Sequence, residues 1–268
     1  MAYFNISDDV QLYYEEQGEG QPVIFIHGVW MSSRFFHKQM PYFGEKYHAF
    51  ALDLRGHGRS SHVPYGHTID TYAQDLHTFI KEKGLKDVTL VGWSMGAMVI
   101  WYYFKQFGAE NIKATVVVDQ SPSDFRWEDW PYGFADFEEL CGIMSQMQTD
   151  RAGFVSEFIP AMFKNPPSEE DFKWMFEEVT LLPECIAGAI IFDEAVQDYR
   201  PVLDKVTVPT LLCFERDEKI IPTAAGEYLR DNMSDARLII FEDSGHCLFI
   251  EEADRFNQEV DQFIQSLD

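Results

Sequence analysis

Residues 88–98 read V-T-L-V-G-W-S-M-G-A-M, and this stretch decides the fold. Its apolar, β-branched beginning predicts a buried strand that stops at Gly92, and a helical pattern begins after Gly96. Ser94 therefore stands at the apex of a sharp turn, with a glycine two residues to either side. So tight a turn strains the backbone and brings the flanking chain close, which requires small residues at those two positions.

The same pattern has a plain structural explanation, because serine is a common residue at the start of a helix. If the serine is instead a nucleophile, it needs a base that removes its proton and an acid that orients the base. It also needs backbone N–H groups that stabilise the oxyanion. The rest of the chain decides between the two interpretations.

The composition describes an acidic chain with ample material for a core. Of its 268 residues 46% are hydrophobic and 15% aromatic, and the formal net charge is −24. One large α/β domain is within reach of this length. The charge argues against nucleic acids and anionic membranes as partners, since both would be repelled, and favours neutral or cationic substrates over polyanions. No leader pattern or membrane-length apolar run is visible, so we expect a cytoplasmic protein.

Strand and helix patterns alternate along most of the chain. An amphipathic hairpin is predicted first, at residues 3–6 and 10–16. Buried-strand patterns follow at 23–26, 48–54, 88–92, 114–118, 210–214 and 237–241, and helical patterns at 34–43, 70–83, 95–107, 223–233 and 253–267. This alternation predicts an α/β fold with a mostly parallel, eight-stranded sheet flanked by helices.

Residues 121–206 interrupt the alternation. The segment lacks a buried-strand pattern, is rich in aromatic residues and methionine, and carries 18 acidic against 6 basic residues. We expect a helical cap inserted after the sixth strand and lying over the strand ends. The predicted domains are therefore a core formed by residues 1–120 and 207–268, and a cap formed by residues 121–206.

Candidate catalytic side chains follow the predicted strands, where ligands bind in parallel sheets. His246 is the best candidate for the base, because it lies in a glycine-containing loop between the last strand and the last helix. Asp217, just past the preceding strand, is the preferred acid. Asp119, at the end of the strand before that, remains the alternative. His27 is expected to bind backbone beside the core rather than to take part in chemistry.

Two backbone N–H groups are candidates for the oxyanion hole. Met95 N–H follows the apex serine, and Val29 N–H lies in the loop after the strand at 23–26, with Trp30 N–H as the fallback. Gly28 lets that loop turn. We expect Trp30, Trp93 and Gly28 to contact the substrate.

No metal or other cofactor is expected. His57, His62 and His67 repeat every five residues, which matches no helix face, and they lie in a turn-rich segment. Asp53 precedes this segment and is expected to brace the turn at residues 55–60.

The chain resembles the α/β-hydrolase family over nearly all of its length. The resemblance rests on four motifs in the family's order: His27-Gly28, the run D-L-R-G-H-G-R-S at 53–60, G-W-S-M-G at 92–96, and Asp217 with Gly245-His246. It is most similar to the cofactor-free haloperoxidase-like esterases and their lactonase relatives. The resemblance implies an acyl-enzyme mechanism with Ser94 as nucleophile.

Two departures bear on the reaction. Some of these relatives make peracids with the help of a proline soon after the His-Gly pair, and Trp30 stands in its place; Ala97-Met98 replaces a glycine common after the turn. Both favour a carboxylesterase or lactonase acting on neutral esters with apolar acyl chains, with acyl-homoserine lactones as the specific candidate. A perhydrolase or haloperoxidase-like activity, and a ligand receptor of this fold with weak turnover, remain the alternatives.

Overall fold

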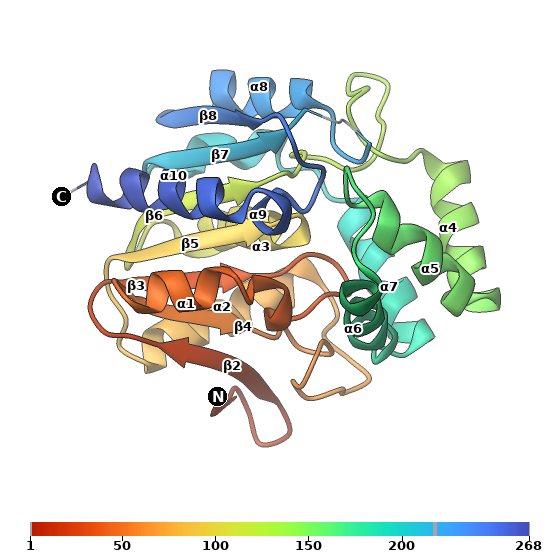
Figure 1. Cartoon of the computed structure of the whole chain (residues 1–268), viewed down its shortest axis with the longest axis horizontal. Coiled ribbons are helices and arrows are strands. Elements are labelled where there is room, and N and C mark those ends of the chain that lie inside the picture. The colour runs from red at the N-terminus through yellow and green to blue at the C-terminus, as the bar shows by residue number, and fades with distance from the viewer. Residues whose placement is uncertain (1, 217–218, 268) are drawn as a thin grey trace.

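The computed structural model describes residues 2–216 and 219–267 and contains one eight-stranded sheet (Figure 1). The strand order is β1-β2-β4-β3-β5-β6-β7-β8, in which the pairs β1–β2 and β2–β4 are antiparallel and the other pairs are parallel. The mostly parallel sheet predicted from the sequence is confirmed. The strands are β1 (Ala2–Asn5), β2 (Gln11–Gln17), β3 (Pro22–Ile26), β4 (His48–Leu52), β5 (Val88–Trp93), β6 (Ile112–Val118), β7 (Thr210–Glu215) and β8 (Ala236–Phe241).

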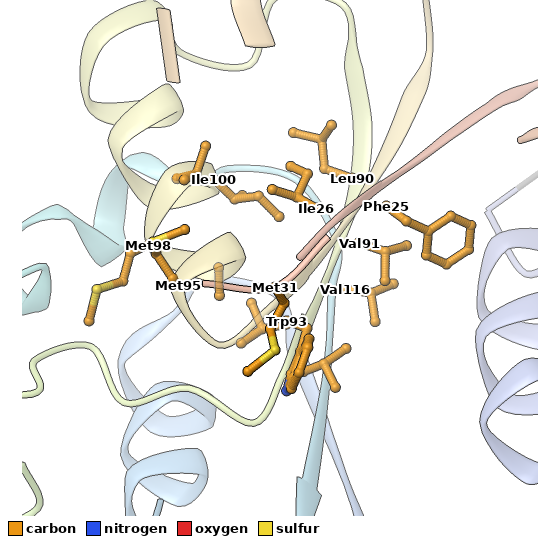
Figure 2. Close-up of a cluster of buried hydrophobic side chains, with 14 of the residues drawn as sticks. Phe25, Ile26, Met31, Leu90, Val91, Trp93, Met95, Met98, Ile100 and Val116 are labelled. Carbon is orange, nitrogen blue, oxygen red and sulfur yellow. The ribbon is translucent and has the colours of Figure 1, made fainter. Parts of the chain in front are cut away.

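The central strands are buried on both faces, which explains their uninterrupted apolar sequences. Figure 2 shows Ile26 and Leu90 pointing to the side of Ile100 in the helix after β5, whereas Phe25 and Val91 point to the other face. This alternation is the two-residue period of a strand. Because a slip by one residue would turn these side chains to the wrong face, the alternation fixes the register of the two strands. In this register the end of β3 lies beside the end of β5.

Helices cover both faces of the sheet (Figure 1). On one face α1 (Gln39–Gly44) packs against α10 (Ala253–Gln265), and on the other α2 (Ile69–Glu82) packs against α3 (Met95–Phe107). α8 (Thr223–Asn232) packs against β7 and β8. The helices α3 and α10 are the amphipathic or apolar segments predicted at 95–107 and 253–267.

The structure contains two short helical segments where the sequence predicts one helix. Residues 34–43 were expected to form a single short helix, but the structure has a 3₁₀ turn, η1 (Ser33–Phe36), followed by α1. Pro41 lies in the first turn of α1. Because proline has no N–H and tolerates only the first turn of a helix, a helix running from residue 34 would break there. A further short helix, α9 (Leu248–Glu251), follows His246 and was not predicted.

The segment between β6 and β7 is helical. It contains α4 (Phe137–Thr149), α5 (Arg151–Ala161), α6 (Glu169–Thr180), α7 (Glu184–Ala195) and the 3₁₀ turn η2 (Arg200–Lys205). Figure 1 shows α4–α7 gathered beyond the end of the sheet toward which the arrows of β5 and β7 point. The predicted helical insertion after the sixth strand is therefore confirmed. The exact boundaries 1–120, 121–206 and 207–268 stay a prediction.

None of the helices within the described residues has the length and apolar character needed to cross a membrane.

Candidate active site

The turn between β5 and α3 holds Ser94 in a strained conformation, with φ 52° and ψ −126°. A Cβ on Gly92 would come within 2.5 Å of the Gly96 carbonyl oxygen, and a Cβ on Gly96 would come still closer to the Ile26 carbonyl oxygen. Both glycines are thus required by close backbone approach. The backbone of Ser94 donates to the Val118 carbonyl oxygen across 3.0 Å, which fixes the turn to the end of β6.

His246 and Asp119 form a buried pair. Nδ1 of His246 donates to Oδ2 of Asp119 across 2.6 Å, and the two side chains are almost fully buried. This bond places the proton on Nδ1 and leaves Nε2 as the acceptor that a serine base requires. Burial raises the pKa of Asp119, and the hydrogen bond from His246 and the charge on that ring oppose the rise. Among the described residues, Oδ1 of Asp119 has no hydrogen-bond partner.

Asp217, the acid preferred from the sequence, lies outside the described residues. The carboxylate that the structure places on Nδ1 of His246 belongs to Asp119, the alternative. Asp119 comes directly after β6 and Glu215 ends β7, and these two strands are paired neighbours. The loops that follow them leave the same edge of the sheet, so position along the chain alone could not decide between the two aspartates.

The predicted oxyanion donors come from the loop after β3 and from the first residue of α3. Trp30 N–H, the fallback donor, donates to Nε2 of His57 across 3.3 Å and is therefore engaged. In residues 2–216 and 219–267 neither Val29 N–H nor Met95 N–H has an acceptor. The predicted donor pair is thus free to bind an anionic oxygen.

Two buried histidines hold the loop that carries Val29. Nδ1 of His27 donates to the Gly28 carbonyl oxygen across 2.8 Å, and its Nε2 accepts the Leu54 N–H across 3.0 Å. Burial lowers the pKa of His27 to about 4 and that of His57 well below its ordinary value, so both rings are neutral. A neutral ring has the one donor and one acceptor that these bonds need. His27 binds backbone, as predicted.

Asp53 joins the same loop to the turn at 55–60. Its Oδ1 accepts the Ser33 N–H at 2.6 Å, and its Oδ2 accepts the Arg59 N–H at 2.7 Å. The predicted bracing of the turn is confirmed. Asp53 extends that bracing to the residues beside the oxyanion donors.

A cavity of about 490 Å³ lies between the core and the cap, and Val29, Trp30, Ser94 and His246 line it. Most of the remaining wall is apolar and comes from the cap, including Phe134, Ile143, Phe154, Phe158 and Ile191.

Trp30 joins core and cap at this wall. Its indole N–H donates to the Ala187 carbonyl oxygen on α7 across 3.1 Å, and its ring meets Phe154 and Phe158 on α5 edge-on, with centroids 5.5 and 5.3 Å away. The cap is therefore docked through a residue of the site itself.

Trp93 and Gly28 differ from expectation, because among the described residues they do not line the cavity. The indole N–H of Trp93 donates to the His246 carbonyl oxygen across 3.1 Å, and its ring packs against Phe249. Gly28 allows close approach, since a Cβ there would lie 3.0 Å from Cβ of Ser94. Both residues support the cavity wall from behind, and their contact with a substrate stays a prediction.

Two residues that line the cavity were not predicted from the sequence. Asp124 and Glu194 line the wall and are 2% exposed each. Neither follows a strand or belongs to a motif, and the acidic cap offered no sign that these two carboxyls turn inward. Within the described part of the chain, His57, His62 and His67 do not form a metal-binding group, and no other three residues of suitable type do.

The comparisons with known proteins agree with this geometry. The chain belongs to the alpha/beta hydrolase family, whose sequence model matches residues 23–259. A non-heme haloperoxidase from Rhodococcus erythropolis is 29% identical, covering 99% of this chain and 100% of that protein. A bifunctional esterase/perhydrolase from Acinetobacter calcoaceticus is 27% identical with the same coverage. The structure of an esterase from Exiguobacterium antarcticum superposes with a TM-score of 0.94 at 25% identity, covering 98% of both chains.

Proposed function

We propose that this protein is a serine hydrolase of carboxylic esters that works through an acyl-enzyme. The observation that carries the proposal is the joint placement of a strained serine and a carboxylate-bound histidine on one cavity wall. The strain at Ser94 raises its hydroxyl above the backbone, and His246 offers the acceptor that activates it. Family membership supports the same reaction class.

In the proposed mechanism, Nε2 of His246 takes the proton of the Ser94 hydroxyl while its oxygen attacks the ester carbonyl. Asp119 stabilises the resulting imidazolium through Nδ1, and the N–H groups of Val29 and Met95 bind the oxyanion. The alcohol leaves with the proton from His246. Water, activated by the same ring, then attacks the acyl-enzyme and releases the acid.

The cavity supports an apolar acyl chain. Its cap wall presents Phe134, Ile143, Phe154, Phe158 and Ile191. Burying each methylene of a substrate contributes roughly 0.8 kcal/mol to binding, so affinity should increase with the length of the acyl chain until the cavity is full. Linear esters and lactones with alkyl chains, among them N-acyl-homoserine lactones, are the substrates that we propose.

A panel of p-nitrophenyl esters of increasing acyl length, assayed beside acyl-homoserine lactones, tests the proposal. We expect kcat/KM to rise with chain length and then to fall, and Ser94→Ala to abolish turnover while the fold is retained. The typical enzyme turns over about ten times per second. Turnover by the wild type at or below roughly one event per minute would point to a ligand receptor instead. Perhydrolysis, measured with acetate and hydrogen peroxide, is the second activity to assay, because a relative is named for it.

A further inference from the structure

Two buried carboxyl groups line the cavity and influence each other electrostatically. Asp124 lies in the segment between β6 and α4, and Glu194 lies in the last turn of α7. Both line the cavity that contains Ser94. Nε2 of Gln120 donates to Oδ1 of Asp124 across 2.9 Å. Oε2 of Glu194 is buried and has no hydrogen-bond partner within the described residues.

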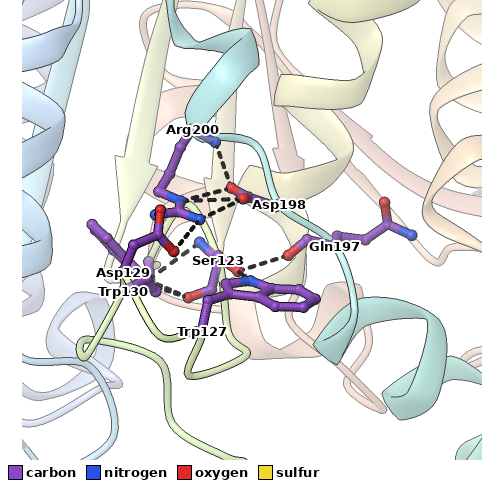
Figure 3. A network of polar contacts seen from close by, with 8 residues as sticks. Ser123, Trp127, Asp129, Trp130, Gln197, Asp198 and Arg200 are labelled. Atoms are coloured by element: carbon purple, nitrogen blue, oxygen red, sulfur yellow. Dashed lines mark hydrogen bonds and ion pairs between the residues drawn. The ribbon is translucent and has the colours of Figure 1, made fainter.

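A polar network next to Asp124 and Glu194 in sequence joins their two segments (Figure 3). The hydroxyl of Ser123 donates to the Gln197 carbonyl oxygen across 2.9 Å and accepts the indole N–H of Trp127 at 2.9 Å. Tyr199 N–H donates to the Pro122 carbonyl oxygen across 2.8 Å. The residue before Asp124 and the residues after Glu194 are thus bonded together, so the two carboxyls are held at one place in the wall.

The second layer of this network is ionic. Arg200 forms ion pairs with Asp198 at 2.7 Å and with Asp129 at 3.0 Å (Figure 3). The indole N–H of Trp130 donates to the Ser123 carbonyl oxygen across 2.9 Å, and the Arg200 guanidinium lies over the Trp130 ring. Arg200 therefore pairs with both carboxylates of this outer layer.

The inner pair, Asp124 and Glu194, has no cation of its own among the described residues. Burial raises the pKa of both carboxyls, and the charge of Asp124 raises that of Glu194 further, as does that of Asp193. Two cations line the same cavity but are bound elsewhere. Arg126 pairs with Asp136 and Glu139, and Nζ of Lys219 donates to the Phe163 carbonyl oxygen across 2.9 Å.

A buried carboxyl pair of this kind is costly unless something positive meets it. Glu194 also stands at the C-terminal end of α7, where the helix dipole disfavours negative charge and favours a cation. The cavity gives access to the pair, and the apolar wall beside it accommodates a hydrocarbon chain.

We propose that Asp124 and Glu194 form a subsite for a positively charged amine, a primary or secondary ammonium group attached to an apolar chain. This inference rests on the proposed function in one respect only, namely that the ligand's chain leads to an ester at Ser94. It revises the expectation of a wholly neutral substrate: the reacting ester is neutral, and the far end of the molecule carries the cation.

Direct binding to the full chain tests the subsite without any turnover. We would titrate hexylammonium and 1-hexanol, which share a chain length, into the wild type by calorimetry. The ammonium should bind at least tenfold more tightly than the alcohol, because it donates to both carboxyls. Its affinity should increase from pH 6 to pH 8, since the amine stays protonated while the carboxyl pair loses its proton.

Three variants make the test specific. Glu194→Gln and Asp124→Asn, on different elements, should each reduce the preference for the ammonium to threefold or less. Glu157→Gln removes one exposed carboxylate from the cap surface and should leave the preference intact. Equal binding of the two probes by the wild type would overturn the subsite. So would an undiminished preference in both cavity variants, with folding checked by circular dichroism.

The outcomes also separate this subsite from the proposed function. The p-nitrophenyl esters of 6-aminohexanoate and heptanoate differ in an ammonium and a methyl group at the chain end. If hexylammonium binds as expected but neither ester is hydrolysed, the proposed function fails and the subsite stands. If both esters are hydrolysed and hexylammonium binds no better than hexanol, the subsite fails and the proposed function stands.

Discussion

Nδ1 of His246 lies 2.6 Å from Oδ2 of Asp119, and this bond joins the loop after β8 to the end of β6. The bond spans 127 positions of sequence and crosses the strand that lies between them in the sheet. It fixes which nitrogen of the ring carries the proton. We therefore propose Asp119 as the acid because the fold brings its carboxylate to His246, and substitution of the residue tests this role directly.

Asp119→Asn should reduce kcat for ester hydrolysis by about 10³–10⁴, because an amide at this position favours the wrong tautomer of His246 and leaves its cation unstabilised. Asp217→Asn, the matched control, should change kcat by less than about tenfold. Steady-state kinetics on p-nitrophenyl butyrate check both variants. The opposite ranking would transfer the acid role to Asp217.

Gly96→Ala should destabilise the protein and abolish activity, since its Cβ would collide with the Ile26 carbonyl oxygen at the turn. Gly142→Ala on α4 is the control, because nothing lies within 4 Å of a Cβ there. Alanine should stabilise that helix by about 0.5–1 kcal/mol. Urea unfolding of the two variants tests the contrast, and equal stabilities would contradict the steric requirement.

Trp30→Ala should weaken the docking of the cap and enlarge the cavity. Loss of the bond to Ala187 and of the contacts with Phe154 and Phe158 should lower the free energy of unfolding by about 3–5 kcal/mol. The preferred acyl chain should become longer. Trp30→Phe keeps most of the ring contacts and should show a smaller loss of stability. A chain-length profile unchanged in Trp30→Ala would remove this residue from the substrate wall.

The contribution of the inner carboxyl pair, Asp124 and Glu194, to stability should fall as the pH rises from 5 to 8. Burial raises the pKa of Asp124 to about 7, far above that of the unfolded chain. The folded protein therefore holds a proton that the unfolded chain has lost, and this advantage disappears as the pH rises through 7.

Asp124→Asn isolates that contribution. Between pH 5 and pH 8 its free energy of unfolding should decrease less than that of the wild type, by on the order of 1 kcal/mol. Burial raises the pKa of Asp53 to about 6, but this group is present in both proteins and its effect cancels. Urea titrations at the two pH values provide the comparison. Equal decreases would show that the pair is ionised in the folded state.

The fold was predictable because its signals are local. The helix expected at 95–107 is α3, residue for residue, and the glycines at 92 and 96 indicate the geometry of the turn before it. The direction of Trp93 also follows from a local signal. The two-residue period of β5 puts it on the face of Val91, and its ring packs against Phe35 and Phe249.

The features of the site that the sequence does not predict depend on contacts between distant segments. Asp119 and Asp217 follow neighbouring strands, and only the path of each loop decides which one meets His246. Asp124 and Glu194 are two acidic residues among many in residues 121–206. Their inward direction comes from the network around Ser123 and Gln197, which joins a core loop to a cap helix and has no periodic signal in the sequence.

Ser94 should form a covalent acyl-enzyme, and intact-protein mass spectrometry after rapid mixing with p-nitrophenyl butyrate detects this intermediate directly. The wild type should gain the mass of one butyryl group, mapped by peptide analysis to Ser94 and lost on longer incubation. Ser94→Ala should gain none. Hydrolysis by the wild type with no adduct, or the same adduct on Ser94→Ala, would contradict the account.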